Sequence, residues 1–317
     1  MTKTKKNTIL AVSIFLVLLL GLCTFLAVQH YCQKIEQTGL NDTIPYGFGK
    51  EAKVIILAGQ SNAAGCTRDD YLRENVSKEQ YEIYENGYDN VYINYFVSES
   101  NESHGFVKCA AHQGEGYQNN FFGPELGLAE KLNELHPNET FFIIKWAWSG
   151  TSLYDHWRSP DDDGTYGPLY PLFVQYVNNS LEYLRLKNYD VKIEAMCWMQ
   201  GESDSIDEYI ALNYEKYLTN FIADIRSEFS CYASDNGISF VDAYISSSIF
   251  WPHYKIINRA KQSVADSSPL NVAIDTISHG LTITKEPSEE PDLAHYDSLS
   301  EIKLGHLFAL EASKFFD

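Results

Sequence analysis

The sequence predicts an α/β domain in which helices cover both faces of a parallel β-sheet. Runs of apolar, often β-branched residues recur along the chain, and amphipathic stretches long enough for helices separate them. The runs are continuous rather than alternating, which is typical of strands buried on both faces. Polar turns follow several of these runs, and open parallel sheets bind their ligands at that end of the strands.

These patterns predict strands and helices in a regular order along the chain. We expect strands at 53–58, 91–96, 141–148, 193–199 and 237–241, and helices at 124–135, 168–187, 207–229 and 298–315. Pro124 suits the first turn of a helix, and Ser298 with Glu301 forms a capping box before the last helix. Apart from its strand, the segment 66–122 is rich in polar residues and predicts loops over the rim of the sheet.

The amino-terminal segment has the features of a membrane anchor. Ile9–Val28 is a mostly apolar run of twenty residues, long enough to cross a hydrocarbon layer of about 30 Å. Lysines precede it, which predicts a cytoplasmic amino terminus and an extracytoplasmic remainder. We therefore expect a cytoplasmic tip and signal anchor at 1–30, a polar stem at 31–50 and one domain at 51–317. A cleaved signal peptide, which would release a secreted protein, is the alternative.

The charge and the cysteine spacing exclude two classes of function. The formal net charge is −19, with 24 Lys and Arg against 43 Asp and Glu, which argues against nucleic acid as a partner. The chain has no Cys-x-x-Cys pair, and its histidines lack the spacing of metal ligands, so we expect no metal site. Cys66 and Cys109 flank a long insertion and could be bridged in an oxidising compartment.

Four polar clusters fall where the predicted strands end or just before the last helix. They are Gly59-Gln60-Ser61-Asn62, Trp148-Ser149-Gly150-Thr151-Ser152, Met199-Gln200-Gly201-Glu202 and Asp292-Leu293-Ala294-His295. Because the carboxyl ends of parallel strands lie at one edge of a sheet, we expect these clusters to meet there. Together they contain a hydroxyl, a backbone N–H beside glycine, a side-chain amide and a carboxylate–imidazole pair.

This set of groups is what acyl transfer requires. The Ser61 hydroxyl becomes a nucleophile when a base, here His295, removes its proton. Asp292, three residues earlier, can hold the imidazole in one tautomer. Fixed donors stabilise the oxyanion by about 3 kcal/mol each, and we expect the N–H groups of Ser61 and Gly150 and the Gln200 amide in this role.

The motifs resemble, in content and order, those of the sialate O-acetylesterase and acetylxylan esterase group, which includes carbohydrate esterase family 6 of the SGNH hydrolase superfamily. The resemblance covers 51–317 and rests on these segments: 59–65, 123–125, 148–153, 200–204 and 292–295. It implies a flavodoxin-like three-layer α/β/α fold with a central sheet of about five strands. It also implies removal of acetyl esters from sugars without metal or cofactor.

Carried over by motif, the resemblance assigns Ser61 as nucleophile, His295 as general base and Asp292 as its orienting acid. Gly150 and Gln200 are the implied oxyanion donors, with Gln200 where the wider superfamily has asparagine. The family often has two glycines before the threonine, and here Ser149 replaces the first. The long insertion 66–122 prevents transfer of a substrate preference from relatives.

Several neighbouring residues have more than one interpretation. Glu202 could replace Asp292 as the triad acid, or it could brace Gln200 and the loop backbone together with Asp204. Gln60 and Asn62 flank Ser61 and could support the site or contact substrate. Among the tryptophans, Trp146 and Trp148 share one strand face that predicts core packing for at least one of them. Trp157 follows in a loop, where it could stack on a sugar.

The leading hypothesis is therefore an extracytoplasmic, membrane-tethered serine esterase that releases acetate from O-acetylated carbohydrate. The carbohydrate could be acetylated xylan, sialic acid or a related glycan. One alternative is a carbohydrate-binding protein with the same fold and no turnover. Another is a lipase or thioesterase of the same superfamily.

Overall fold

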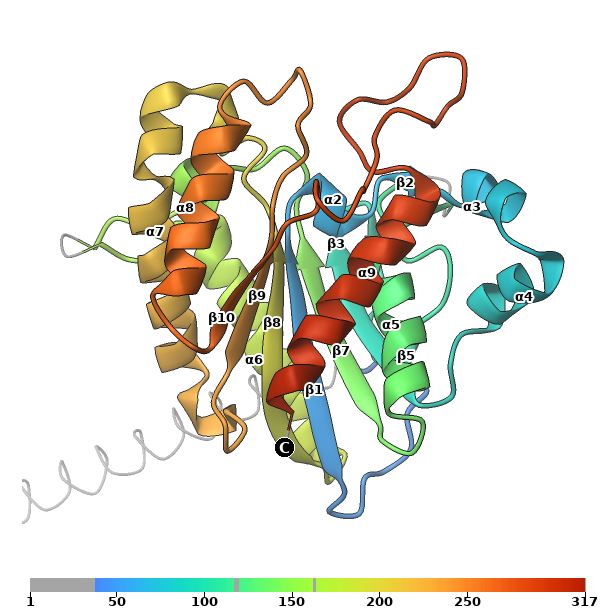
Figure 1. Cartoon of the computed structure of the whole chain (residues 1–317). Helices are drawn as coiled ribbons and strands as arrows, with labels where there is room; N and C mark the ends of the chain where they lie inside the picture. The colour runs from blue at the N-terminus through green and yellow to red at the C-terminus, as the bar shows by residue number, and fades with distance from the viewer. Residues whose placement is uncertain (1–37, 117–119, 162–163, 317) are drawn as a thin grey trace, which may run out of the picture.

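The computed structural model describes residues 38–116, 120–161 and 164–316. A central sheet of eight strands runs through this part of the chain, and six of its strands are parallel (Figure 1). The parallel strands, in spatial order, are β10 (Asn271–Ile274), β9 (Ser239–Ala243), β8 (Asp190–Met199), β1 (Glu51–Gly59), β7 (Phe141–Ala147) and β3 (Val91–Val97). The short strands β4 (Asn101–Glu102) and β5 (Val107–Lys108) pair antiparallel with β3.

The insertion 66–122 adds an edge strand to a doubly wound core. Without β3, the chain order of the parallel strands gives the spatial order 2-1-3-4-5, which is the order of flavodoxin-like sheets. The prediction of five strands counted β3 and missed β10. This strand has four residues and only Ile274 is buried, so its sequence lacks the continuous apolar run that identifies the other strands.

Helices cover both faces of the sheet, as expected. In Figure 1, α5 (Pro124–Leu135) and α9 (Ser298–Ala312) lie side by side in front of the sheet, and α6 (Leu169–Leu186) lies behind it. α7 (Glu208–Glu228) and α8 (Tyr254–Asp266) pack against each other and complete the layers. The Trp198 ring of β8 packs between Trp157 and Phe221 of α7, which joins the sheet to the helices through aromatic contacts.

Short elements connect these layers and form the rim. The helices among them are α2 (Ser61–Ala64), α3 (Asp69–Asn75) and α4 (Lys78–Asn86), and the single turns are η1 (Leu153–Trp157), η2 (Asp204–Ile206), η3 (Ser230–Tyr232) and η4 (Ser313–Phe315). A two-stranded ribbon pairs β2 (Thr67–Arg68) with β6 (Phe121–Phe122). The insertion 66–122 is therefore more ordered than the predicted loops, with two helices and five strands.

The last helix begins differently from the prediction. Its N-cap is Asp297, and no side-chain capping bond is formed by the expected Ser298–Glu301 box. Instead, Ser298 donates from its backbone N–H and its hydroxyl to the Glu286 carboxylate, while Glu301 is fully buried against the sheet. A carboxylate from a distant loop thus does the capping that we expected from within the helix.

Residues 38–50, which we expected to form the end of a polar stem, pack on the domain. Thr43 donates its N–H to the carbonyl of Phe106, Ile44 is buried, and Asp42 forms an ion pair of 2.6 Å with Lys187 of the segment after α6. The predicted anchor and the first part of the stem lie outside the described residues. Within residues 38–316, no helix is long and apolar enough to cross a membrane.

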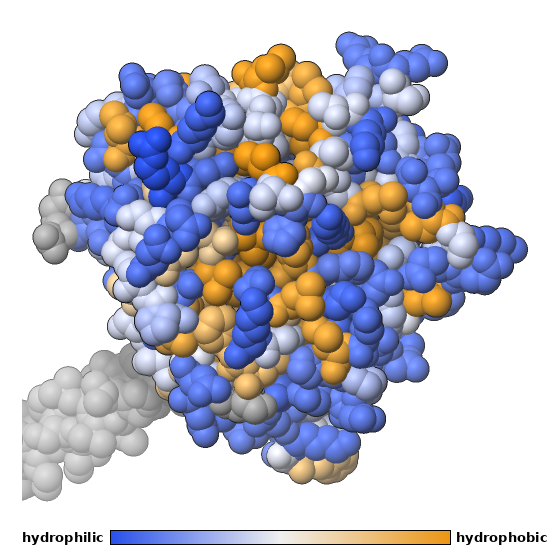
Figure 2. All heavy atoms as spheres, viewed as in Figure 1, coloured by the Kyte–Doolittle hydropathy of each residue, from blue (hydrophilic) through white to orange (hydrophobic). Residues whose placement is uncertain are grey.

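The surface in Figure 2 is mostly hydrophilic, but apolar side chains gather at the top of the view, over the end of the sheet where the strands terminate. Ile249 and Phe250, in the segment that follows β9 at this end of the sheet, are exposed. The loops with the polar clusters lie at the same end.

A buried ion pair joins the front helix layer to the sheet. Lys145 of β7 contacts Glu125 of α5 at 2.6 Å, and neither side chain is exposed to solvent. Lys145 also donates to the carbonyl of Gln113, and the N–H of Gly123 donates to the other oxygen of Glu125. The pair therefore links the insertion, the start of α5 and the centre of the sheet.

We expect Lys145→Met to lower the free energy of unfolding by about 3–5 kcal/mol, because it leaves a buried carboxylate without its cation. The double variant Lys145→Met/Glu125→Leu removes both charges and should be more stable than the single variant. Urea denaturation of the purified proteins measures both. A double variant less stable than Lys145→Met would contradict this account of the pair.

Candidate active site

Three strands end at the same level and place the polar clusters together. Gly59 of β1 is in register with Ala147 of β7 on one side and with Met199 of β8 on the other. The bonding continues one residue further, because Trp148 donates its N–H to the Gly59 carbonyl and Gln60 to the Met199 carbonyl. The loops after these strands therefore start from one rim, at the switch point where such sheets bind ligands.

Ser61 is the first residue of the short helix α2, directly after β1. Two glycines make this turn possible. Gly59 has φ +144°, and a Cβ there would lie 1.9 Å from the Met199 carbonyl oxygen. Gly65 has φ +87°, and a Cβ there would lie 2.4 Å from the backbone nitrogen of Gly123. Glycine at these two positions therefore permits both a tight turn and a close approach of neighbouring backbone.

Asn62 ties the Ser61 turn to the His295 loop. Its Nδ2 donates to the Ala294 carbonyl at 3.3 Å, and its Oδ1 accepts the Tyr296 N–H at 3.1 Å. One buried amide thus holds the backbone on both sides of His295. The segments carrying Ser61 and His295 are therefore joined through a single side chain, although they are far apart in the sequence.

The imidazole and its partner carboxylate form the expected pair. His295 Nδ1 lies 2.6 Å from Asp292 Oδ2, and Ala294 donates its N–H to the other Asp292 oxygen. The contact with His295 lowers the pKa of Asp292, so this group stays ionised through the mildly acidic range. Because Nδ1 is used by the carboxylate, Nε2 is the nitrogen available to a hydroxyl.

The backbone N–H groups of Ser61 and Gly150 have no acceptor among the described residues. Gly150 is exposed, has φ +69°, and faces open space at its Cβ position. Ser149, at the position where the resemblance implies a glycine, does not have positive φ. It donates its N–H to Ser98 and its hydroxyl to Glu115, so the substitution adds contacts to the loop without strain.

The position of Gln200 contradicts its predicted role as an oxyanion donor. Its side chain is fully buried, and its amide nitrogen lies within hydrogen-bond distance of three protein acceptors, Gln60 Oε1, the Thr151 carbonyl and Asp204 Oδ2. A primary amide has two hydrogens, so none remains for a substrate. Gln200 instead holds the loops after β1, β7 and β8 together. Gln60 has the same supporting role, since its Oε1 also accepts the N–H groups of Gly201 and Ser203.

Two buried carboxylates support the loops, but only Asp204 contacts Gln200, which the bracing interpretation had expected of Glu202. Glu202 accepts from Asn62 at 2.8 Å, and burial raises its pKa. Asp204 accepts the N–H groups of Leu153 and Tyr154 at the start of η1. Burial raises the pKa of Asp204 to about 6, in spite of these donors.

Trp157 is not an exposed stacking platform. Its ring is fully buried, packs against Trp146 and Trp198, and donates its Nε1 hydrogen to Thr151. Trp146 is also buried, as expected for the core. The possible bridge between Cys66 and Cys109 is absent, since both are free thiols that contact different groups, Glu115 and the Glu125 carbonyl.

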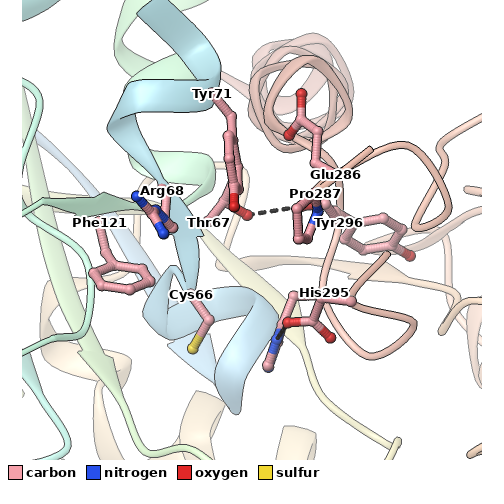
Figure 3. A pocket seen from close by; sticks show the side chains of 10 residues that line it. Cys66, Thr67, Arg68, Tyr71, Phe121, Glu286, Pro287, His295 and Tyr296 are labelled. Carbon is pink, nitrogen blue, oxygen red and sulfur yellow. Dashed lines mark hydrogen bonds and ion pairs between the residues drawn. The ribbon is translucent and has the colours of Figure 1, made fainter. Parts of the chain in front are cut away.

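A cavity of about 120 Å³ opens beside the imidazole. Ten residues line it: Cys66, Thr67, Arg68, Tyr71, Phe121, Glu286, Pro287, Asp292, His295 and Tyr296. Figure 3 shows Cys66, Arg68 and His295 around one hollow, and its dashed line marks the bond from Thr67 Oγ1 to the Tyr296 carbonyl at 2.7 Å. Half of the lining residues come from the insertion, where sequence motifs had identified no site residue. Cys66 and Thr67 directly follow the Ser61 motif in the sequence, and this adjacency could have indicated that they line the site.

Comparison with known proteins identifies the family. Residues 51–314 match the family described as "Carbohydrate esterase, sialic acid-specific acetylesterase". The chain belongs to this carbohydrate esterase family. No curated protein sequence matches significantly.

Solved structures share the fold of this carbohydrate esterase. A protein from Arabidopsis thaliana superposes with a TM-score of 0.61 at 18% identity, over 83% of this chain and 99% of the other. NanS superposes with a TM-score of 0.61 at 15% identity, over 86% and 99% of the two chains. XAC1771, a carbohydrate acetylesterase from Xanthomonas citri, gives 0.52 at 14% identity, over 83% of this chain and 56% of that protein.

The Asn62 contacts predict an effect on turnover in this esterase. Asn62→Ala should lower kcat by about 10²-fold, because small displacements of a catalytic base have effects of that size. Asn94→Ala is the matched control, since Asn94 is an equally buried amide with two side-chain partners, Ser180 and Ser103, outside the site. Ester hydrolysis and thermal unfolding are measured for both. Equal losses of kcat in the two variants would show that the loss comes from reduced stability and not from displacement of His295.

Asp204 predicts a pH-dependent difference in stability between the esterase and its Asp204→Asn variant. The pKa of this group is 3.8 when unperturbed and about 6 in the fold, so the unfolded chain releases the proton first. The contribution of Asp204 is complete below pH 4 and is lost as the pH rises through about 6. The free energy of unfolding of wild type, relative to Asp204→Asn, should fall by about 2 kcal/mol between about pH 4.5 and 7.5. A difference that stays constant in urea titrations over this range would contradict the assignment.

Proposed function

We propose that the protein is a serine esterase that removes O-acetyl groups from carbohydrate through an acyl-enzyme. The observation that carries this proposal is the Asn62 amide, which joins the Ser61 turn to a histidine already paired with a carboxylate at 2.6 Å. A nucleophile, a base and an orienting acid are the minimal set for this reaction. Membership of the carbohydrate esterase family supports the same chemistry.

In the first half-reaction, Ser61 Oγ attacks the acetyl carbonyl carbon while His295 Nε2 takes the hydroxyl proton. Asp292 holds the Nδ1 hydrogen and stabilises the imidazolium that forms. The tetrahedral intermediate collapses when the sugar oxygen leaves and takes the proton from His295. Water then repeats the sequence on the acetyl-serine, releases acetate and restores the hydroxyl of Ser61.

The backbone N–H groups of Ser61 and Gly150 are the donors we propose for the oxyanion. Both lack protein acceptors within the described residues, and the donors that serve an oxyanion must be free in the same way. Gln200 is assigned to support instead, because its amide hydrogens are used by the loops. It holds the Thr151 carbonyl, one residue beyond Gly150, and so fixes the loop that carries the second donor.

The family description, which names an acetylesterase, favours a short acyl group over the lipase or thioesterase alternative. We therefore expect hydrolysis of p-nitrophenyl esters to fall as the acyl chain lengthens beyond acetate and propionate. Activity that rises with chain length would favour a lipase. The paired His295 and Asp292 argue against a binding protein that lacks turnover.

Substitution of the triad tests the mechanism. Ser61→Ala should lower kcat for p-nitrophenyl acetate by at least about 10⁴-fold, and Asp292→Asn by about 10³–10⁴-fold, because asparagine fixes the wrong tautomer of His295. Glu202→Gln is the matched carboxylate control. It preserves the acceptor for Asn62 and should have a far smaller effect on kcat. The reverse order for Asp292→Asn and Glu202→Gln would make Glu202 the triad acid.

A further inference from the structure

Arg68 lies in the wall of the active-site cavity and is fixed relative to His295. It follows Thr67 in β2, and Thr67 Oγ1 donates to the carbonyl of Tyr296, the residue after His295. Its strand partner is Phe121, another residue of the cavity wall. Figure 3 shows the guanidinium of Arg68 near the Cys66 side of the hollow, with His295 lining the same hollow. The arginine and the histidine are therefore held by neighbouring, hydrogen-bonded segments.

The guanidinium is oriented by an acid on one edge and an aromatic ring beside it. Arg68 donates from Nε and Nη2 to the two oxygens of Asp70, which is a side-on bidentate contact. Asp70 is itself held, because its Oδ1 accepts the backbone N–H of Tyr71. The Arg68 Cζ lies 5.0 Å from the centroid of the Tyr71 ring. These contacts hold a long, flexible side chain in one plane.

This arrangement leaves the outer edge of the fork unused. A guanidinium has five N–H donors, and the side-on pair with Asp70 leaves Nη1 and the second hydrogen of Nη2. No described residue accepts from Nη1. That edge has the spacing that matches two carboxylate oxygens end-on.

The acids of the cavity wall are already committed to other groups. Glu286 accepts from Ser298 and Asn75, and Asp292 accepts from His295 and Ala294. Among the described residues that line this cavity, Arg68 is the one Lys or Arg. Of the charged groups in this wall, Arg68 is therefore the one with unused donors, and the complement of such a donor pair is a planar anion.

We propose that Arg68, oriented by Asp70, is a specificity-determining residue that binds a carboxylate on the acetylated sugar. This inference rests on the proposed esterase function and adds the residue that recognises the carboxylate; the family description already names sialic acid, which is a sugar acid. A sugar acid would place its acetyl ester at Ser61 and its carboxylate on the outer edge of the guanidinium. A neighbouring cavity of about 450 Å³ shares Tyr71, Glu286 and Pro287 with the first and gives room for the rest of the glycan.

The test compares substrates that differ only in charge. Acetate release is measured from an O-acetylated sialic acid and from its carboxamide, and from an acetylated glucuronic acid and its carboxamide. Wild type should favour the acid over the amide by about tenfold or more in kcat/KM for at least one sugar, through KM. The sugar that shows the preference identifies the source of the carboxylate.

Variants of Arg68 then assign the preference to this residue. Arg68→Gln should reduce the acid-to-amide ratio to near one, and Arg68→Lys should give an intermediate ratio because it keeps the charge and loses the fork. Arg185→Gln is the matched control, since Arg185 is an exposed arginine paired with Glu182 away from the site, and it should keep the wild-type ratio. Hydrolysis of p-nitrophenyl acetate by each variant shows whether its triad is intact.

Two results overturn the proposal about Arg68. One is a wild type that cleaves acid and amide equally, and the other is an Arg68→Gln variant that keeps the preference while still cleaving p-nitrophenyl acetate. Either result leaves the esterase function standing. Failure of wild type to cleave p-nitrophenyl acetate at all would instead count against the proposed function itself.

Discussion

The site depends on one buried amide. Asn62 contacts Glu202 below it and the backbone on both sides of His295, so three segments meet at a single side chain. An amide can do this because it donates twice and accepts once, whereas a carboxylate could serve neither acceptor and a hydroxyl only one of them. The loop that carries His295 has no regular secondary structure, and Asn62 gives it a fixed position relative to the sheet. Precision at the proposed catalytic residues therefore comes from a supporting residue.

A layer of buried polar groups lies beneath the catalytic loops. Lys145 pairs with Glu125 and Lys261 pairs with Asp242, all almost without exposure to solvent. Glu301 is fully buried, and burial together with the charge of Glu125 raises its pKa. Buried pairs of this kind give little net stability but are costly to break singly. The two pairs restrict the relative positions of α5, α8 and the sheet, which is the requirement for loops that must meet within hydrogen-bond distance.

The fold, and the positions of the loops that carry Ser61 and His295, could be predicted from the sequence because their signals are local. The continuous apolar runs of β1 and β7 and the Ser61 turn each lie within about ten residues. The errors concern tertiary context. Gln200 and Trp157 follow strands in segments where exposed side chains are expected, yet both are buried. The residues that bury them are distant in the sequence, so no local motif predicts the burial. The capping of α9 by Glu286 depends on a contact between residues twelve positions apart in the chain. The position of Arg68 in the cavity wall depends on the pairing of β2 with β6, which no local sequence pattern predicts.

The close approach of Gly65 to Gly123 has a consequence for how this family can diversify. The two glycines bracket the insertion, and their backbones touch, so the excursion begins and ends at one point, although its strand β3 belongs to the central sheet. Outside β3 such a segment resembles a cassette, because its length and composition can change while the entry and exit geometry stays constant. The excursion supplies half of the cavity wall but none of the proposed triad. New ligand preferences could thus arise by exchange of this module, with the reaction chemistry inherited intact.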